Sequence, residues 1–173
     1  MKLIGLIFWF YLVFSHPVNA APRIAVLNFE LLDVTLLPNA PEELTRTASM
    51  KPLLEQAISR LGNYEIVQIS INDQNTATAG VGYLFNFNDI AAKLGKQSGA
   101  DWVVVGQHSK HSFLYSYVMA HLINVKNQNL AGDFPTELKG THPKVTERGI
   151  NALAKKLTAR IMQLADSSLK HAP

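Results

Sequence analysis

The chain has no cysteine among its 173 residues. This absence excludes disulfide bonds, a thiol nucleophile, zinc–thiolate sites and iron–sulfur clusters. It also excludes a lipoprotein, because the lipid of such a protein is attached to a cysteine at its mature N-terminus. We therefore expect a fold that is held together by its hydrophobic core alone.

Clustered positive charge is also missing. Sixteen lysines and arginines against 13 acidic residues give a formal net charge of only +3 at pH 7. No run of basic residues resembles a nucleic-acid-binding patch, so we expect no nucleic-acid partner.

Sequence motifs of catalysis are absent as well. No glycine-rich phosphate loop runs from a predicted strand into a helix. No Gly-x-Ser-x-Gly elbow accompanies the serines that lie near histidines, which are Ser109, Ser112 and Ser116. We therefore expect a protein that is not an enzyme, with no catalytic residue and no cofactor.

One long apolar run does occur, at the N-terminus. Lys2 precedes the nearly continuous run Leu3–Phe14, and small residues lead up to Ala20. This arrangement is typical of a secretory signal peptide, and the run is shorter than the roughly 20 residues of a membrane-spanning helix. We expect residues 1–20 to be a signal peptide cleaved near Ala20, which places the protein in the periplasm or outside the cell. An uncleaved N-terminal anchor is the alternative.

Residues 21–173 predict a single exported domain. The expected strands cover residues 23–29, 64–71, 102–106, 113–125 and 130–138. The expected helices cover residues 41–61, 90–97 and 141–166, the first with a kink at Pro52 or a later start near Ser49. Residues 31–40 and 72–82 are predicted loops, and residues 167–173 a frayed tail.

This order of elements favours an α/β domain with a mixed sheet of the α+β kind. Strand–helix–strand crossovers favour parallel pairing of the first three strands, and the short turns later in the chain favour antiparallel pairing. The predicted order is strand, helix, strand, helix, three strands and helix, with the helices packed on the sheet. Gly132 and Pro135 in the last strand indicate a sheet edge or a bulge.

Three histidines are weak candidates for a metal site. His108 and His111 are three residues apart, and His121 lies on the next strand. A hairpin between these strands would bring His108 towards His121, but residues i and i+3 of a strand face opposite sides. No carboxylate close in sequence completes the ligand set, so ordinary polar histidines are the preferred interpretation.

Two carboxylates follow the first predicted strand. Glu30 and Asp33 lie at its carboxyl end, where open α/β sheets bind ligands, and paired-carboxylate chemistry is one interpretation. The preferred interpretation is that these carboxylates are solvated in a loop or cap a helix. Asp101 precedes its strand and lies at the wrong end.

Alternating aromatic residues are candidates for a partner-binding surface. Tyr83, Phe85 and Phe87 alternate, as do Phe113, Tyr115 and Tyr117, and alternation places each set on one face of an extended segment. Core packing is one interpretation, and an exposed interface is the other. We select Tyr115, Tyr117, Tyr83 and Phe85 as partner-binding candidates. Residues 72–88 and strand addition at the edge 130–138 are further options.

Two segments carry a resemblance to a known family. They are Ile-Ala-Val-Leu-Asn-Phe-Glu-Leu-Leu-Asp at residues 24–33 and Gly-Ala-Asp-Trp-Val-Val-Val-Gly-Gln at residues 99–107. Together with the N-terminal run, they resemble predicted secreted bacterial proteins of unknown function of the DUF2380/DUF3280 type, over nearly the whole of residues 21–173. More distantly, they resemble the N-terminal domain of TolB, the periplasmic domain of CsgG and the lipoprotein activators of peptidoglycan synthases.

The resemblance implies an α/β module that binds other envelope proteins and is not an enzyme. Close relatives often carry a cysteine pair ahead of the second helix, where this chain has Phe85–Asn88, so no thiol role transfers. We therefore predict a non-catalytic accessory or adaptor domain of the cell envelope that acts by protein–protein binding. Because some relatives are encoded near quinoprotein alcohol dehydrogenases, the alternative is a small-ligand or metal binder that serves an exported oxidoreductase.

Overall fold

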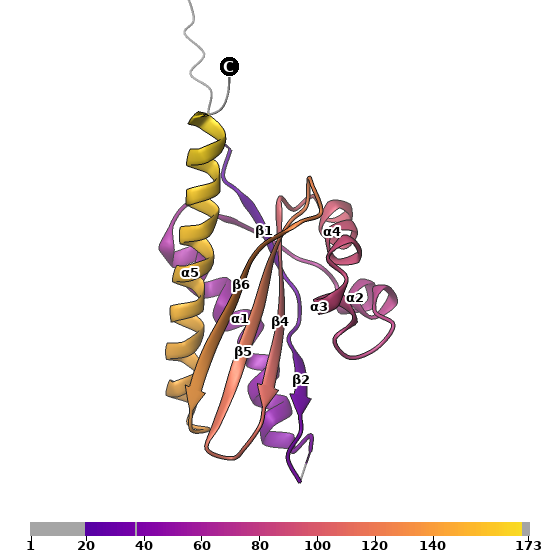
Figure 1. Ribbon diagram of the computed structural model, residues 1–173, viewed down its shortest axis with the longest axis vertical. Helices are drawn as coiled ribbons and strands as arrows, with labels where there is room; N and C mark the ends of the chain where they lie inside the picture. The colour runs from indigo at the N-terminus through magenta and orange to yellow at the C-terminus, as the bar shows by residue number, and fades with distance from the viewer. Residues whose placement is uncertain (1–19, 37, 171–173) are drawn as a thin grey trace, which may run out of the picture.

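The computed structural model describes residues 20–36 and 38–170 (Figure 1). The predicted signal peptide, except Ala20, lies outside the described residues. Within them, no helix is both long and apolar enough to cross a membrane.

The described residues form one six-stranded mixed sheet. Its strands are β1 (Arg23–Val26), β2 (Glu30–Asp33), β3 (Glu65–Val67), β4 (Trp102–Lys110), β5 (Tyr115–Asn124) and β6 (Leu130–Lys139). Their order is β3-β1-β4-β5-β6, and β2 pairs with β4 beyond the end of β1. Strand β1 pairs in parallel with β3 and with β4, and β2 pairs in parallel with β4. Strand β5 pairs antiparallel with β4 and with β6, which confirms the predicted mixed sheet.

Helices cover the two faces of the sheet unequally. They are α1 (Pro41–Leu61), α2 (Ile71–Ala77), α3 (Tyr83–Asn86), α4 (Asn88–Gln97) and α5 (Pro143–Lys170). The two long helices, α1 and α5, pack on one face, and the three short helices gather beside the upper part of the strands on the other (Figure 1). The short helices do not reach the lower ends of β2, β4 and β5.

The central strands separate two hydrophobic cores. Alternate residues of β1 and β4, such as Ile24 and Val104, pack under α1 and α5, whereas Ala25 and Val103 pack under α4. Since successive side chains of a strand point to opposite faces, a strand covered on both sides is apolar throughout. This is the reason for the continuous apolar runs in the sequence.

Three elements differ from the sequence-based predictions. Residues 30–33 form strand β2 and are not a loop, because the backbone from Glu30 to Asp33 pairs with β4. Residues 71–77 form α2, whose first turn is stabilised by the Ser70 hydroxyl accepting a hydrogen bond from the Asp73 amide. Residues 83–86 form the short helix α3, so the alternating aromatics there do not lie on an extended segment.

The bounds of the two long helices settle two details of the prediction. Helix α1 begins at Pro41 and continues through Pro52, so a later start near Ser49 is wrong. Pro52 is exposed, and its ring removes one backbone hydrogen bond from the helix without ending it. Helix α5 continues to Lys170, four residues beyond its predicted end, and residues 171–173 of the predicted tail lie outside the described residues.

Candidate functional site

One row of side chains crosses four strands on the face that carries the short helices. Leu32 of β2 is paired with Ser109 of β4, Ser109 with Tyr117 of β5, and Tyr117 with Glu137 of β6. Tyr115 and His111 adjoin this row at the β4–β5 hairpin. We call these six residues, Leu32, Ser109, His111, Tyr115, Tyr117 and Glu137, the open face.

The open face is accessible, except at the buried Ser109, because no short helix extends over it. Along β5, the residues that point to α1 and α5 are buried, whereas Tyr115 is 41 % exposed and Tyr117 is half-buried. Leu32 is 37 % exposed on the neighbouring strand. The same sheet face is buried higher up, at Val105 and Ile123, where α4 and its neighbours cover it.

The aromatic rings of the open face hold one another in place. The Tyr115 and Tyr117 ring centroids are 5.9 Å apart at an interplanar angle of 80°, and those of His111 and Tyr117 are 6.2 Å apart at 73°. The Ser109 hydroxyl lies 3.0 Å from Nε2 of His111. Edge-to-face rings fixed in this way lose little side-chain freedom on binding, which favours recognition of a partner.

The other two aromatic candidates pack into the fold. Phe85 stacks on His121 with ring centroids 3.7 Å apart, and its carbonyl oxygen is 2.9 Å from Nδ1 of that histidine. The ring centroids of Tyr83 and Phe87 are 4.6 Å apart, and Tyr83 packs against the core beneath α4. The structure therefore brings Tyr115 and Tyr117 together and places Tyr83 and Phe85 apart from them. Phe113 lies outside β5, 5.2 Å from the Lys110 ammonium.

The three histidines do not converge. His108 is fully buried under α1, with Nδ1 2.7 Å from the Thr47 hydroxyl and Nε2 2.9 Å from the Ser116 hydroxyl. His121 lies on the opposite sheet face, and His111 belongs to the open face. No group of three or more histidine, aspartate or glutamate side chains suited to a metal ion occurs among the described residues.

Burial disfavours the charged forms of His108 and His121. Burial lowers the pKa of His108 to about 4, and the positive charges of Arg46 and Lys110 act in the same direction. Burial lowers the pKa of His121 as well, against the opposing charge of Asp133. The arrangement of Ser116 beside His108 offers no hydrolase site, because Ser116 is only 2 % exposed.

Two carboxylates and two cations form a buried ion cluster beneath α1. Lys110 Nζ is 3.4 Å from Asp33 and 3.6 Å from Glu43, and Glu43 is 3.5 Å from Arg46. The side chains of these residues are at most 9 % exposed. Burial raises the pKa of Asp33, but hydrogen bonds from Thr35 and the charge of Lys110 outweigh it, so that this pKa lies below its ordinary value.

The ion cluster decides the role of the carboxylates that follow β1. Asp33 points under α1 to Lys110, whereas Glu30 accepts a hydrogen bond from the Gly82 amide on the other side of the sheet. Glu30 and Asp33 therefore do not form a catalytic pair. Asp101 accepts a hydrogen bond from the Arg23 amide at the opposite end of the strands.

The outer edge of β6 is partly blocked. The Pro135 carbonyl accepts a hydrogen bond from Lys156 at 2.9 Å, and the Ala131 carbonyl accepts one from Arg160 at 2.8 Å. Pro135 also has no amide hydrogen to donate. These features argue against strand addition along residues 131–135 and are typical of a protected sheet edge.

Removing this protection is expected to increase self-association. In the double variant Lys156→Ala/Arg160→Ala, two edge carbonyls of β6 lose their donors and become available to a second chain. Sedimentation velocity over a range of concentrations should show stronger self-association than in the wild type. Lys155→Ala, which changes an exposed neighbour on the same helix, is the control. Identical sedimentation of the double variant and the wild type would argue against protection of this edge.

Comparison with known proteins places the chain in a family and identifies its fold. The model of the DUF3280 family, described as "Protein of unknown function (DUF2380)", matches residues 22–157. No curated protein of similar sequence was found.

Solved structures share the fold at low identity. The PelC dodecamer from Paraburkholderia phytofirmans is 14% identical with a TM-score of 0.51, over 82% of this chain and 87% of PelC. LpoB from E. coli is 16% identical with a TM-score of 0.50, over 69% of this chain and 57% of LpoB. TolB from Acinetobacter baumannii is 18% identical with a TM-score of 0.46, over 83% of this chain and 28% of TolB. The family match confirms the predicted resemblance to the DUF2380/DUF3280 type, and at these identities the similarity to PelC and LpoB establishes the fold alone.

Proposed function

We propose that this chain, which belongs to the DUF3280 family, is an exported accessory domain that binds another protein of the cell envelope through its open face. The main support for this proposal is the row Leu32–Ser109–Tyr117–Glu137, which runs across four strands and is flanked by the exposed Tyr115. Tyrosine is enriched at protein interfaces because its ring contributes apolar contact area and its hydroxyl a hydrogen bond.

The side chains of the open face favour a protein partner whose binding surface is both apolar and polar. Leu32 and the two tyrosine rings supply apolar contact, while Glu137 and His111 at the margins supply polar groups. An apolar centre with a polar rim is the usual anatomy of a protein interface. The PelC protein, whose structure shares this fold, is a dodecamer, which is an example of protein–protein contact on this fold.

The positions of the candidate catalytic residues are consistent with a non-catalytic role. Ser116 and His108 are buried, and Asp33 is neutralised by Lys110. An exposed group with a partner for acid–base or nucleophilic catalysis is therefore not found at these positions. The export of the domain rests on the predicted signal peptide, residues 1–20.

The double variant Tyr115→Thr/Tyr117→Thr is expected to lose its partner and to keep its fold. Threonine retains the strand preference of β5, while the two rings of the open face are removed. Loss of two aromatic anchors is expected to cost about 2–4 kcal/mol of binding, which is about 30-fold or more in affinity. The measurement is capture of tagged protein from the envelope fraction of its own organism after crosslinking, read by mass spectrometry.

The control variant for this experiment is Met162→Ala, which removes an exposed apolar side chain from α5, away from the open face. The wild type and Met162→Ala should retain one dominant partner that the double variant has lost. Equal recovery of that partner by all three proteins would contradict the role of the open face.

A further inference from the structure

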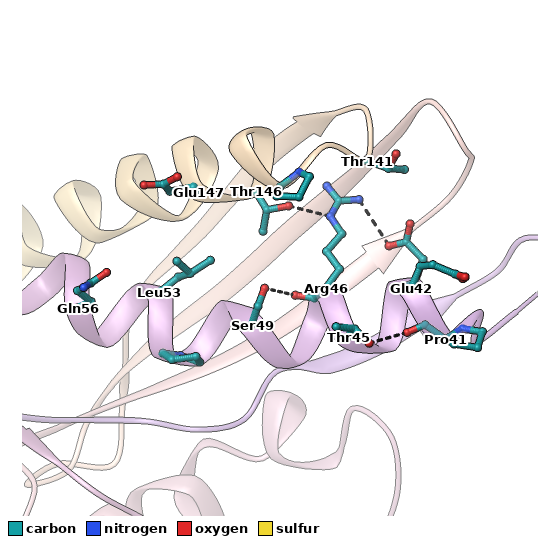
Figure 2. A pocket seen from close by; sticks show the side chains of 13 residues that line it. Pro41, Glu42, Thr45, Arg46, Ser49, Leu53, Gln56, Thr141, Thr146 and Glu147 are labelled. Atoms are coloured by element: carbon teal, nitrogen blue, oxygen red, sulfur yellow. Dashed lines mark hydrogen bonds and ion pairs between the residues drawn. The ribbon is translucent and has the colours of Figure 1, made fainter.

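A second surface lies on the opposite side of the sheet, between α1 and the start of α5. Figure 2 shows this groove, which has a volume of about 1050 Å³. One wall is a stripe of α1 whose members are three or four residues apart, Pro41, Thr45, Ser49, Pro52 and Gln56. At about 1.5 Å per residue, this stripe is roughly 22 Å long, the length of four helical turns.

At the floor of the groove, the Arg46 side chain is held by hydrogen bonds, and its charge is compensated by a neighbouring carboxylate. The Arg46 side chain is only 9 % exposed, and it donates hydrogen bonds to the Thr146 hydroxyl at 2.8 Å and to the Gly140 carbonyl at 3.0 Å. Arg46 is the one cation among the described lining residues, and its charge is compensated by Glu43 at 3.5 Å. It therefore leaves no excess positive charge in the groove.

Both walls of the groove carry a carboxylate at the rim. Glu42 is exposed on α1 and Glu147 is exposed on α5, and neither forms an ion pair within the part of the chain that the structure describes. Pro52, Leu53 and Pro143 contribute apolar surface between them. The groove thus combines an apolar interior with negative charge on each side.

We propose that this groove binds a basic amphipathic helix of a partner protein. The wall of four turns matches the length of such a helix, and its short side chains, Thr45 and Ser49, permit close approach. Apolar residues of the bound helix lie against Leu53 and the prolines, and its lysines or arginines pair with Glu42 and Glu147. Complementary charge on both rims fixes the orientation of the bound helix.

A second copy of this chain does not supply that helix. The long helix α5 presents exposed basic residues at Lys144, Arg148 and Lys155, while Lys156 and Arg160 are hydrogen-bonded to carbonyls of β6. Its apolar stripe is buried against the sheet at Leu153 and Leu157. A free basic amphipathic helix is therefore not found on the surface of the described residues, and the occupant comes from another protein.

The probe for this proposal is a pair of synthetic peptides of 18 residues. One has leucine at helical spacings of three and four and lysine elsewhere, and the other has glutamate in place of every lysine. The lysine peptide should bind saturably to the full domain and shift the amide resonances of Thr45, Ser49 and Thr141. The glutamate peptide should not bind.

Charge reversal of the rims tests the assignment. Glu42→Lys/Glu147→Lys should weaken binding of the lysine peptide by about tenfold or more, because two attractive charge pairs become repulsive. Asp166→Lys, which reverses a single carboxylate at the far end of α5, should leave binding unchanged. Thr45→Trp, which fills the groove without changing its charge, should also abolish binding, and thermal unfolding confirms that each variant is folded.

Four results would overturn the proposal. They are absence of saturable binding by the lysine peptide, equal binding of both peptides, equal binding by wild type and the rim variant, and resonance shifts confined to the open face. Shifts of the groove amides that grow with protein concentration in the absence of peptide would assign the groove to self-association instead.

Discussion

Replacing Lys110 by methionine is expected to lower the free energy of unfolding by about 3–5 kcal/mol. The Lys110 side chain is 3 % exposed and lies within 3.6 Å of both Asp33 and Glu43. Without the ammonium group, two buried carboxylates remain with one compensating cation, Arg46. The cost of an uncompensated buried charge is much larger than the net value of the ion pair itself.

The measurement is urea unfolding of the wild type and the variant at neutral pH. Lys139→Met is the matched control, because the Lys139 side chain is 81 % exposed and its pair with Glu137 lies in solvent. Its loss should change stability by less than about 1 kcal/mol. The double variant Lys110→Met/Asp33→Asn should be less destabilised than the sum of the single variants, since it removes the stranded charge together with its partner. Strictly additive effects would show that Asp33 and Lys110 are not coupled.

Acidification from pH 6.5 to pH 4 is expected to destabilise the fold by about 3 kcal/mol through His108 alone. Burial lowers the pKa of this histidine to about 4 from an ordinary value of 6.5. Between these two pH values the unfolded chain binds a proton that the folded chain does not bind. The stability contributed by neutral His108 is therefore complete above pH 6.5 and is lost as the pH falls to about 4.

Burial and the groups around His108 account for the lowering of its pKa. Arg46 and Lys110 disfavour a second positive charge, whereas Asp33 favours it, and Thr47 and Ser116 supply hydrogen bonds. The lowered pKa of His121 adds a change of the same sign. The lowered pKa of Asp33 acts at lower pH, because its contribution is lost only as the pH falls below the ordinary value of 3.8.

The pH dependence of unfolding measures this effect in the wild type and in His108→Gln. The variant is expected to be less stable at neutral pH and to lose most of the change between pH 6.5 and pH 4. His111→Gln, which alters an exposed histidine of the open face, should retain that change. The same slope in His108→Gln and the wild type would show that another group is responsible.

The sequence predicted the elements whose signal is local. Continuous apolar runs at residues 23–29 and 102–106 correspond to β1 and β4, which are covered on both faces. Strand β2 was missed because it has only four residues, begins and ends with an acid, and becomes a strand by pairing with β4. Helix α3 was missed because a single helical turn leaves no periodic pattern that differs from alternation.

The candidate site was predictable only in part, because some of its residues are brought together by strand pairing and not by a local pattern. Tyr115 and Tyr117 alternate along β5, and the alternation of buried and accessible residues in that strand identifies an uncovered face. Leu32 joins them through strand pairing, which no local pattern reveals. The ion cluster joins Asp33, Glu43 and Lys110 from three separate elements, and its only sequence signal is a lysine at the end of a strand whose residues are otherwise buried.

Site-specific photo-crosslinking from the open face tests the central claim most directly. A photoreactive phenylalanine derivative is placed at Tyr115, with a matched placement at the exposed Asp166 of α5. We expect irradiation of intact cells to give one dominant crosslinked protein from position 115 and none from position 166. The same products from both positions, or no product from position 115, would contradict a partner-binding role for the open face.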